Sequence, residues 1–330
     1  MKGKHHIIIE SAHLKYEFDI RRNITIIQGD SATGKTTLIE LLSDYRGGQM
    51  DSPVRIESDI PCEVLNKPGE RWEQILDLIS DSIIFIDEDN HFIRSKEFAE
   101  AVRGSSNYFV LITREVLPLL PYSINEVYGI RTSGKYHFPE QVYHEFYPIY
   151  GDELPADEDG FGNLRLITED SESGLQFFKG CLKDPAEAVG AGGNSKVYQM
   201  MKEQPEDSTL AVIADGAAFG AYAARVLEYA DLRGNTMLYF PESFEWLILK
   251  AGVISSGIAD EILMHPEDHI DSKNYMSWEQ YFAQLLISET KDDEIRAYRK
   301  SSLKPYYLGK NVRDKILKVI PGQLQKWIEG

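Results

Sequence analysis

The sequence is poor in cysteine and has no long apolar run, and each absence excludes a class of protein. Its two cysteines, Cys62 and Cys181, stand far apart among 330 residues, so neither a disulfide framework nor a cysteine-based metal site is indicated. No stretch approaches the roughly 18 apolar residues of a membrane-spanning helix. The N-terminal stretch has neither the apolar core nor the cleavage site of a secretion signal. We therefore expect a cytoplasmic protein that does not associate with membranes.

Positive charge is scarce as well. Lys and Arg number 35 against 53 Asp and Glu, a net charge of −18, so the surface as a whole repels nucleic acid. Residues 291–330 are an exception, with ten basic and five acidic residues. Within them the basic segment 296–318 interleaves its charges with Tyr298, Tyr306 and Tyr307. This segment either forms solvated helices packed on an acidic body or contacts the phosphates and bases of nucleic acid.

The sequence contains a P-loop motif, in ITIIQGDSATGKTTLIELL. A buried strand over 24–27 precedes the loop and a helix follows it, which is the context that the motif requires. The backbone N–H groups of the loop are expected to surround nucleotide phosphates at the helix N-terminus. Lys35 reaches the β- and γ-phosphates in this prediction, and the Thr36 hydroxyl ligates Mg²⁺. The nucleotide-binding residues are thus Gly29, Asp30, Ser31, Ala32, Thr33, Gly34, Lys35, Thr36 and Thr37.

A second acid for the metal follows the next hydrophobic strand, in SIIFIDEDN. Asp87 is expected to hold Mg²⁺ through water, and Glu88 to polarise the attacking water, so Glu88 and Lys35 are the predicted catalytic residues. A third strand, NYFVLITRE, ends at Thr113 and Arg114 on the same sheet edge. Arg114 either senses the γ-phosphate or pairs with a surface acid.

The remaining motifs narrow the class of P-loop protein. An Asn-Lys pair occurs at Asn66, but it lacks the aspartate by which GTPases read guanine. The paired strands before the loop and the GKTTL sequence resemble ATPases of the ABC type. Only 51 residues separate Thr36 from Asp87 (87 − 36), too few for an ABC helical subdomain. The resemblance is therefore to a reduced ATPase of the ASCE type, over residues 1–135. A nucleotide kinase is the alternative, although an arginine-rich lid is missing.

Residues 136–163 mix prolines, acids and aromatics without a helical period, so we interpret them as a connecting segment. After them, short β and α segments alternate over 164–255, which predicts a second α/β domain with a mainly parallel sheet and helices on both faces. Glu169 and Asp215 follow two of its strands and are expected to meet at one sheet edge. A helical region with a basic tail occupies 256–330.

The second domain resembles a TOPRIM domain, the metal-binding fold of topoisomerases, primases and OLD-family nucleases. Glu169, the Gly192-Gly193-Asn194 turn and Asp215 match its pattern, and PESFEWLIL with Glu242 and Glu245 resembles an acidic helix of related defence proteins. The resemblance implies that Glu169 and Asp215 ligate Mg²⁺. Ala217 stands where the pattern has another aspartate, which weakens the site. Three interpretations stay open: a non-cleaving domain, a nuclease with rearranged ligands, and an α/β domain whose acids only cap helices.

An ATPase followed by a TOPRIM-like domain is also the order in OLD-family proteins, and the chain resembles bacterial ATP-binding proteins of mobile elements. These resemblances imply the cofactors ATP and Mg²⁺, with nucleotide state controlling how the second domain meets nucleic acid or a protein partner in phage defence or mobile-element biology. The alternatives are an ATP-gated nuclease and a non-enzymatic adaptor with a structural nucleotide. A homo-oligomer is expected, because many such ATPases complete their site across a dimer.

Overall fold

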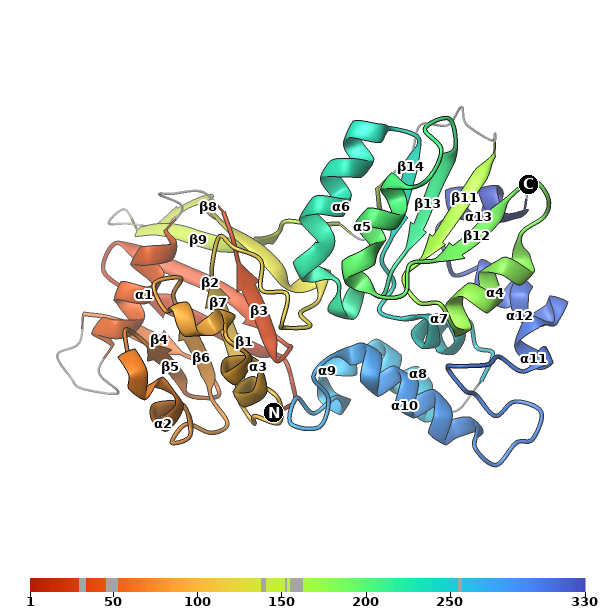
Figure 1. Ribbon diagram of the computed structural model, residues 1–330. Coiled ribbons are helices and arrows are strands. Elements are labelled where there is room, and N and C mark those ends of the chain that lie inside the picture. The colour runs from red at the N-terminus through yellow and green to blue at the C-terminus, as the bar shows by residue number, and fades with distance from the viewer. Residues whose placement is uncertain are drawn as a thin grey trace. The chain divides into compact units, whose positions relative to one another are not determined.

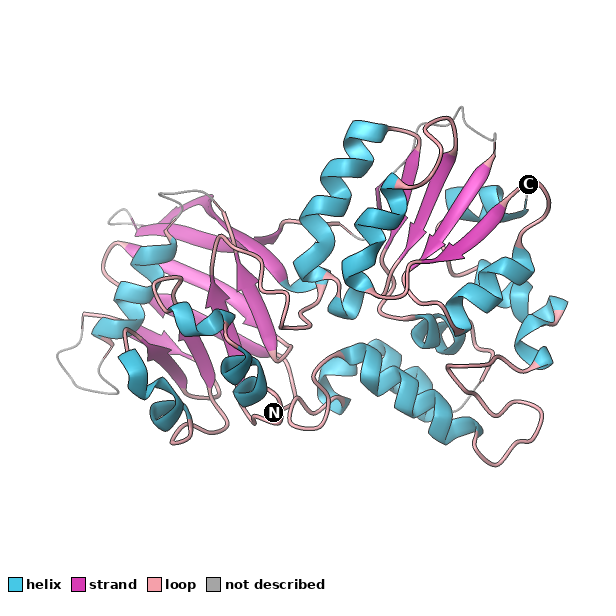
Figure 2. Ribbon diagram, in the orientation of Figure 1, coloured by secondary structure: helices cyan, strands magenta, loops and turns pink. Residues whose placement is uncertain are grey.

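The computed structural model describes residues 1–29, 34–45, 53–137, 141–151, 153–154, 163–254 and 257–329. The chain divides into two compact units, each with its own sheet. The first unit comprises Met1–Tyr150 and Pro266–Ser277, and the second comprises Gly151–His265 and Trp278–Gly330. Both are α/β, as the sequence predicts (Figure 2). No helix within the described ranges is both long enough and apolar enough to cross a membrane.

The first unit contains a nine-stranded, mostly parallel sheet (Figure 1). In spatial order the strands are β4-β1-β2-β9-β8-β3-β7-β6-β5. The block β8-β3-β7-β6-β5 is parallel throughout, while β1 runs antiparallel to β2 and β4. The strands are β1 His5–Glu10, β2 Leu14–Ile20, β3 Ile24–Ile27, β4 Arg55–Glu57, β5 Cys62–Leu65, β6 Ile83–Ile86, β7 Tyr108–Ile112, β8 Val127–His137 and β9 Gln141–Pro148.

The central strands of this sheet consist of apolar residues because both of their faces are covered. All residues of β3, β6 and β7 are buried. The helices and helical turns of this unit are α1 Lys35–Asp44, α2 Trp72–Leu76, α3 Lys96–Val102, α9 Pro266–His269, η1 Gly69–Arg71, η2 His91–Arg94 and η3 Ile124–Glu126. Leu38, Ile39 and Leu42 of α1 join a core with Ile7, Phe18 and Phe85.

The hairpin of β8 and β9 lies where the sequence analysis places the end of the ATPase domain and a connecting segment. β8 pairs in parallel with β3, and β9 pairs in parallel with β2. Phe146 of β9 stacks on Phe18 with ring centroids 4.0 Å apart. β8 and β9 therefore join the two halves of the first sheet.

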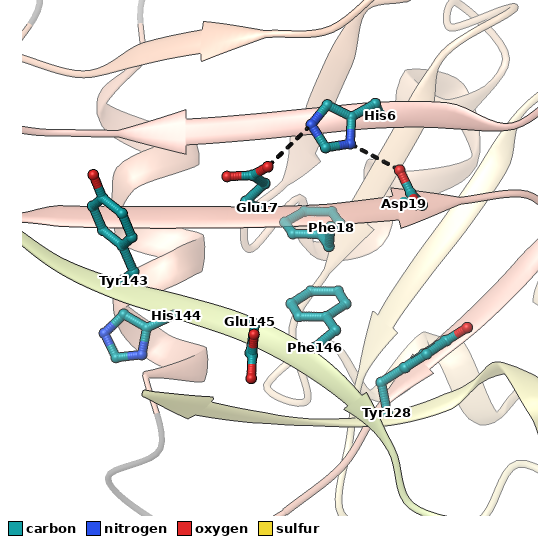
Figure 3. A pocket seen from close by; sticks show the side chains of 9 residues that line it. All are labelled: His6, Glu17, Phe18, Asp19, Tyr128, Tyr143, His144, Glu145 and Phe146. Carbon is teal, nitrogen blue, oxygen red and sulfur yellow. Dashed lines mark hydrogen bonds and ion pairs between the residues drawn. The ribbon is translucent and has the colours of Figure 1, made fainter. Parts of the chain in front are cut away.

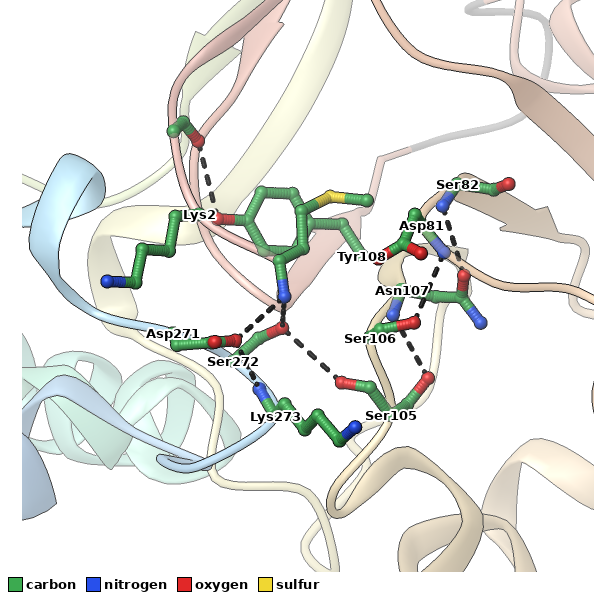
Figure 4. A network of polar contacts seen from close by, with 12 residues as sticks. Lys2, Asp81, Ser82, Ser105, Ser106, Asn107, Tyr108, Asp271, Ser272 and Lys273 are labelled. Atoms are coloured by element: carbon green, nitrogen blue, oxygen red, sulfur yellow. Dashed lines mark hydrogen bonds and ion pairs between the residues drawn. The ribbon is translucent and has the colours of Figure 1, made fainter.

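Residues 266–277 return to the first unit and pack beside its N-terminus (Figure 4). The Met1 ammonium lies 2.8 Å from Asp271 Oδ1 and 3.0 Å from Ser272 Oγ. The Ser272 hydroxyl in turn donates to the Ser105 carbonyl at 3.4 Å. Asn23 Nδ2 donates to the Met276 carbonyl at 2.7 Å. These bonds attach a segment from late in the chain to the loops around β7.

The second unit contains a five-stranded sheet in the order β10-β14-β13-β11-β12. Four strands are parallel, and β10 runs antiparallel at the edge. The strands are β10 Glu153–Leu154, β11 Leu164–Thr168, β12 Glu187–Gly190, β13 Thr209–Ile213 and β14 Thr236–Tyr239. β12 ends two residues before the predicted Gly192-Gly193-Asn194 turn.

The direction of the chain reverses in this sheet. It passes from β11 outward to β12 through α4, and returns across β11 to β13 and β14 through α5 and α6. Right-handed crossovers then place α4 on the face opposite α5 and α6. The reversal leaves a crevice at the carboxyl ends of β11 and β13. The helices of the unit are α4 Ser173–Cys181, α5 Asn194–Lys202, α6 Gly220–Arg233, α7 Phe244–Lys250, α8 Gly257–Met264, α10 Trp278–Thr290, α11 Pro305–Leu308, α12 Lys310–Leu317 and α13 Gly322–Glu329, with the helical turn η4 Gly216–Ala218.

Candidate nucleotide site and acid cluster

The P-loop motif connects the carboxyl end of β3 to the N-terminus of α1. Gly29 and Gly34 have φ of 130° and 95°, in the region that favours glycine. The Lys35 side chain is buried, and its Nζ donates to the Gly29 carbonyl at 2.5 Å. Thr36 is exposed at the start of the helix. Of the predicted loop residues, Asp30, Ser31, Ala32 and Thr33 lie outside the described ranges.

Tyr16 of β2 fixes the end of this loop. Its hydroxyl donates to the Gly34 carbonyl at 2.9 Å, and its ring stacks on His144 of β9 at 4.7 Å. Burial lowers the pKa of His144, so this imidazole is neutral near pH 7. A Cβ atom at Gly34 would lie 2.7 Å from the Tyr16 hydroxyl. The glycine is therefore required both by its backbone conformation and by the tyrosine.

The predicted acids follow β6, and the predicted arginine follows β7. Asp87 Oδ1 accepts the Glu88 N–H at 2.8 Å. Burial raises the pKa of Asp87, and the neighbouring acids Asp89 and Glu88 raise it further. Arg114 Nε lies 3.4 Å from Glu88 Oε1. Of the two roles predicted for Arg114, pairing with an acid is the one present, and that acid is the predicted catalytic residue.

Topology brings these groups to one edge of the sheet. β3, β7 and β6 are parallel neighbours, so Lys35, Arg114 and Asp87 all follow carboxyl ends at the same edge. Thr113 N–H donates to the Ile27 carbonyl at 3.1 Å, which extends the pairing of β7 with β3 to the loop. The edge thus holds one buried ammonium, two carboxylates and one guanidinium.

A separate cavity of about 400 Å³ lies among β1, β2, β8 and β9 (Figure 3). His6 lies over its rim, 2.8 Å from Asp19 and 3.5 Å from Glu17. His144, which stacks on Tyr16 beside the P-loop, also lines this cavity. The carboxylates Glu17, Asp19 and Glu145 at its rim are all engaged by Lys, His or Arg side chains.

In the second unit, Glu169 and Asp215 meet in the crevice between β11 and β13, as predicted from their positions after the two strands. Glu169 Oε2 accepts the Asp215 N–H at 3.0 Å. Burial raises the pKa of Glu169 to about 7, and the charge of Glu279 adds to this effect. Burial likewise raises the pKa of Asp215 well above its ordinary value, with Glu169 as the next cause. Neither acid caps a helix; the α4 N-terminus is capped by Asp170, which accepts from Gly174 and Leu175 N–H groups.

The segment after Asp215 is held tightly against the end of β14. Gly216 N–H donates to the Pro241 carbonyl at 2.6 Å, and a Cβ at Gly216 would lie 2.6 Å from the Phe240 carbonyl oxygen. Ala217 is 2% exposed. Asn194 Nδ2, from the glycine-rich turn, donates to the Ala218 carbonyl at 3.0 Å. The predicted turn thus supports the backbone at Ala217.

Two more acids join this pair from distant parts of the chain. Glu245, in the first turn of α7, is 0% exposed, and its Oε1 accepts a hydrogen bond from the Tyr298 hydroxyl, with 2.7 Å between the two oxygens. Glu279, in the first turn of α10, accepts from Lys300 Nζ at 2.8 Å. We call Glu169, Asp215, Glu245 and Glu279 the acid cluster. Nothing in the sequence around Lys300, Tyr298 or Glu279 marks them as part of this site, because only the fold brings them to it.

The basic segment 296–318 contributes to this packing. Tyr298 and Tyr307 are 3% and 0% exposed, so neither ring is available to stack on a base. Tyr307 Oη donates to the Arg296 carbonyl at 2.6 Å. The segment therefore packs as helix and loop against the second unit, with Arg296 and Lys310 exposed at its surface.

The acid cluster does not fit the Mg²⁺ that the TOPRIM resemblance implies. No group of three or more His, Cys, Asp or Glu residues within the described ranges is arranged to hold a metal ion. One oxygen each of Glu169, Glu245 and Glu279 already accepts a hydrogen bond from another group of the protein. No role for a metal is derived at this site.

Comparison with known proteins identifies no relative: no family model, curated protein or solved structure matches the chain. Its function must be inferred from the two sites.

Proposed function

We propose that the chain binds ATP with Mg²⁺ at the edge of the first sheet and hydrolyses it, as a reduced P-loop ATPase. The observation that carries the proposal is the convergence of four groups on that edge. Lys35 lies behind a positive-φ glycine at the start of α1, while Asp87, Glu88 and Arg114 follow the two neighbouring parallel strands. A buried ammonium at a helix N-terminus suits the phosphates of a nucleotide.

Each group has a role that its position supports. Lys35 donates to a loop carbonyl, an acceptor that a phosphate oxygen can replace. Thr36 would ligate Mg²⁺ directly and Asp87 would hold it through a bound water, while phosphate oxygens would supply further ligands. When bound, Mg²⁺ would neutralise charge that develops on the phosphates. Glu88 orients the attacking water, and Arg114 balances charge beside it.

The strand order also supports the ATPase class. β7 stands between the P-loop strand β3 and the strand β6 that leads to Asp87 and Glu88. This order places Lys35, Arg114 and Asp87 after three neighbouring parallel strands, as the proposed site requires. A nucleotide kinase needs cationic groups over a second substrate, and Arg114 is already paired with Glu88.

For the second unit we propose a non-cleaving role, with nucleotide state altering how it meets a partner. The nuclease alternative is weakened because the acid cluster offers no metal site among the described residues. A nucleic-acid partner is weakened by the burial of Tyr298 and Tyr307. A protein partner, in phage defence or mobile-element biology, and a homo-oligomer remain parts of the proposal.

Nucleotide binding tests the proposal directly. Titration calorimetry with ATP and Mg²⁺ would compare the wild type with Lys35→Ala, and with Lys96→Ala as a matched control. Lys96 is exposed at the start of α3 and belongs to none of the predicted nucleotide motifs. We expect ATP affinity to fall by at least about 100-fold in Lys35→Ala, consistent with the loss of a charge-assisted phosphate contact, and to stay unchanged in Lys96→Ala. Equal affinities in the three proteins would overturn the assignment.

A further inference from the structure

We propose that the Lys300 ammonium, in place of a divalent metal ion, is the resident cation of the acid cluster. The inference concerns the second unit alone and stands whether or not the first unit hydrolyses ATP. Lys300 belongs to the basic C-terminal segment, whose charges are expected from the sequence either to face solvent or to contact nucleic acid.

Three carboxylates of the acid cluster already have a donor of the protein close to one of their oxygens. Glu279 Oε1 lies 2.8 Å from Lys300 Nζ, an ion pair of good geometry. Glu245 Oε1 accepts from Tyr298, whose hydroxyl also lies 2.8 Å from Ser173 Oγ. Glu169 Oε2 is held by a backbone N–H. One oxygen of each of these three carboxylates is therefore already engaged by a donor of the protein.

The acid cluster also leaves little space for a metal ion. A cavity of only about 10 Å³ lies between Glu169, Asp170 and Asp215, with Phe178, Phe244 and Leu247 closing it. That volume admits one water molecule at most. Mg²⁺ binds with octahedral geometry and usually keeps several waters. The apolar side of the cavity offers no oxygen to complete such a shell.

The backbone segment that carries Lys300 to the acid cluster is anchored by hydrogen bonds. Residues 291–304, which we call the strap, connect α10 to α11 and lie against α4. Gln176 of α4 holds the strap through both ends of its amide: Nε2 donates to the Ser301 carbonyl at 3.1 Å, and Oε1 accepts the Leu303 N–H at 2.9 Å. Tyr298 N–H donates to Thr290 Oγ1 at 2.9 Å in the interior. Hydrogen bonds therefore fix the backbone on each side of Lys300, and the one at Tyr298 is buried.

The negative charges around Lys300 keep its ammonium protonated. Burial lowers the pKa of Lys300, but Glu245, Glu279 and Asp215 outweigh it and raise the pKa above its ordinary value, so the ammonium stays charged. Glu245 Oε2 is buried without a hydrogen-bond partner in the described part of the chain. Its charge is the largest of the three contributions to Lys300. The Lys300 ammonium thus pairs with Glu279, and its positive charge also acts on Glu245 and Asp215.

The test uses the full chain without nucleotide at pH 8. Thermal unfolding would compare the wild type, Lys300→Met and Lys304→Met, each in EDTA and in millimolar MgCl₂. Lys304 is a matched control, since it lies in the same strap and its Nζ donates to the Glu294 carbonyl. Deuterium exchange of β11 and β13 reports the second unit specifically.

We expect wild-type unfolding to be the same in EDTA and in Mg²⁺. Lys300→Met is expected to lower the midpoint for the second unit by about 5 °C and to speed exchange of β11 and β13, while Lys304→Met changes neither. A wild type that Mg²⁺ stabilises through the second unit, or a Lys300→Met as stable as its control, would overturn the proposal.

A second measurement needs no folded Lys300 variant. Electron paramagnetic resonance would count Mn²⁺ bound to nucleotide-free wild type, Asp87→Asn and Glu169→Gln. The proposal expects no bound Mn²⁺ that depends on Glu169. Mn²⁺ that persists in Asp87→Asn but is lost in Glu169→Gln would show a metal where Lys300 is assigned, whatever the first unit does.

Discussion

Replacing Glu169 by Gln is expected to stabilise the second unit at pH 8 and to leave it almost unchanged near pH 5. Burial raises the pKa of this carboxyl to about 7 from an ordinary value of 4.5. Between these values the folded chain binds more protons than the unfolded chain, so stability falls as pH rises through the window. The contribution of the protonated acid is fully present below about pH 4.5 and is lost above about pH 7.

The magnitude follows from the same shift. The difference of about 2.5 pKa units corresponds to at most about 3.4 kcal/mol at 1.36 kcal/mol per unit. Part of that penalty is shared with Asp215, so a gain of about 1–2 kcal/mol is expected for Glu169→Gln at pH 8. The glutamine carbonyl oxygen can still accept the Asp215 N–H.

Deuterium exchange of β11 and β13, corrected for intrinsic rates, measures the local opening free energy at both pH values. Glu187→Gln is the matched control, because Glu187 begins β12 on the same sheet and pairs with Arg165 at the surface. A gain of equal size at pH 5 and pH 8, or a loss at pH 8, would refute the reasoning. Either result would mean that Glu169 is not held mainly by its burial.

Three further predictions concern single residues. Gly34→Ala forces a Cβ against the Tyr16 hydroxyl at a φ of 95°, so ATP affinity measured by calorimetry should fall at least tenfold; unchanged affinity would refute the loop assignment. Gly216→Ala meets a backbone carbonyl at 2.6 Å and should destabilise the second unit by about 3 kcal/mol in chemical unfolding; a loss below about 0.5 kcal/mol would contradict the described packing. Arg114→Ala releases Glu88 and should slow ATP hydrolysis at least about tenfold while ATP binding persists; an unchanged rate would remove Arg114 from the site.

The local pattern of the sequence predicts most of the elements that carry the two sites. The strands that precede Gly29, Glu88 and Asp215 are runs of β-branched residues buried on both faces, a composition that is typical of parallel sheets. The α/β class is confirmed for both units. ATP, Mg²⁺ and the catalytic roles stay predictions.

The pairing of β8 with β9 could not be predicted in this way, because β9 includes an acid and a proline and is half-buried along most of its length. Such a strand shows neither a fully apolar run nor a clear alternation. It is fixed instead by pairing with β2 and β8, which is a property of the whole sheet.

Lys300 was beyond prediction for a different reason. It lies 131 residues from Glu169 (300 − 169) in a segment whose composition is that of an exposed basic tail. Its ion-pair partner Glu279 lies on α10, and Glu245, whose charge also acts on it, lies on α7. Charge patterning along a sequence identifies neighbours on one helix face, and it carries no signal for charges that separate elements bring together.

Single-turnover hydrolysis of ATP by Glu88→Gln tests the central claim most directly. Radiolabelled ATP would be mixed with excess wild type, Glu88→Gln or the control Glu57→Gln, whose carboxylate pairs with Arg55 on the edge strand β4. We predict that Glu88→Gln binds ATP as tightly as the wild type and releases phosphate at least about 100-fold more slowly, as expected for a lost general base. Hydrolysis at the wild-type rate in Glu88→Gln, or no ATP bound to the wild type, would contradict the account.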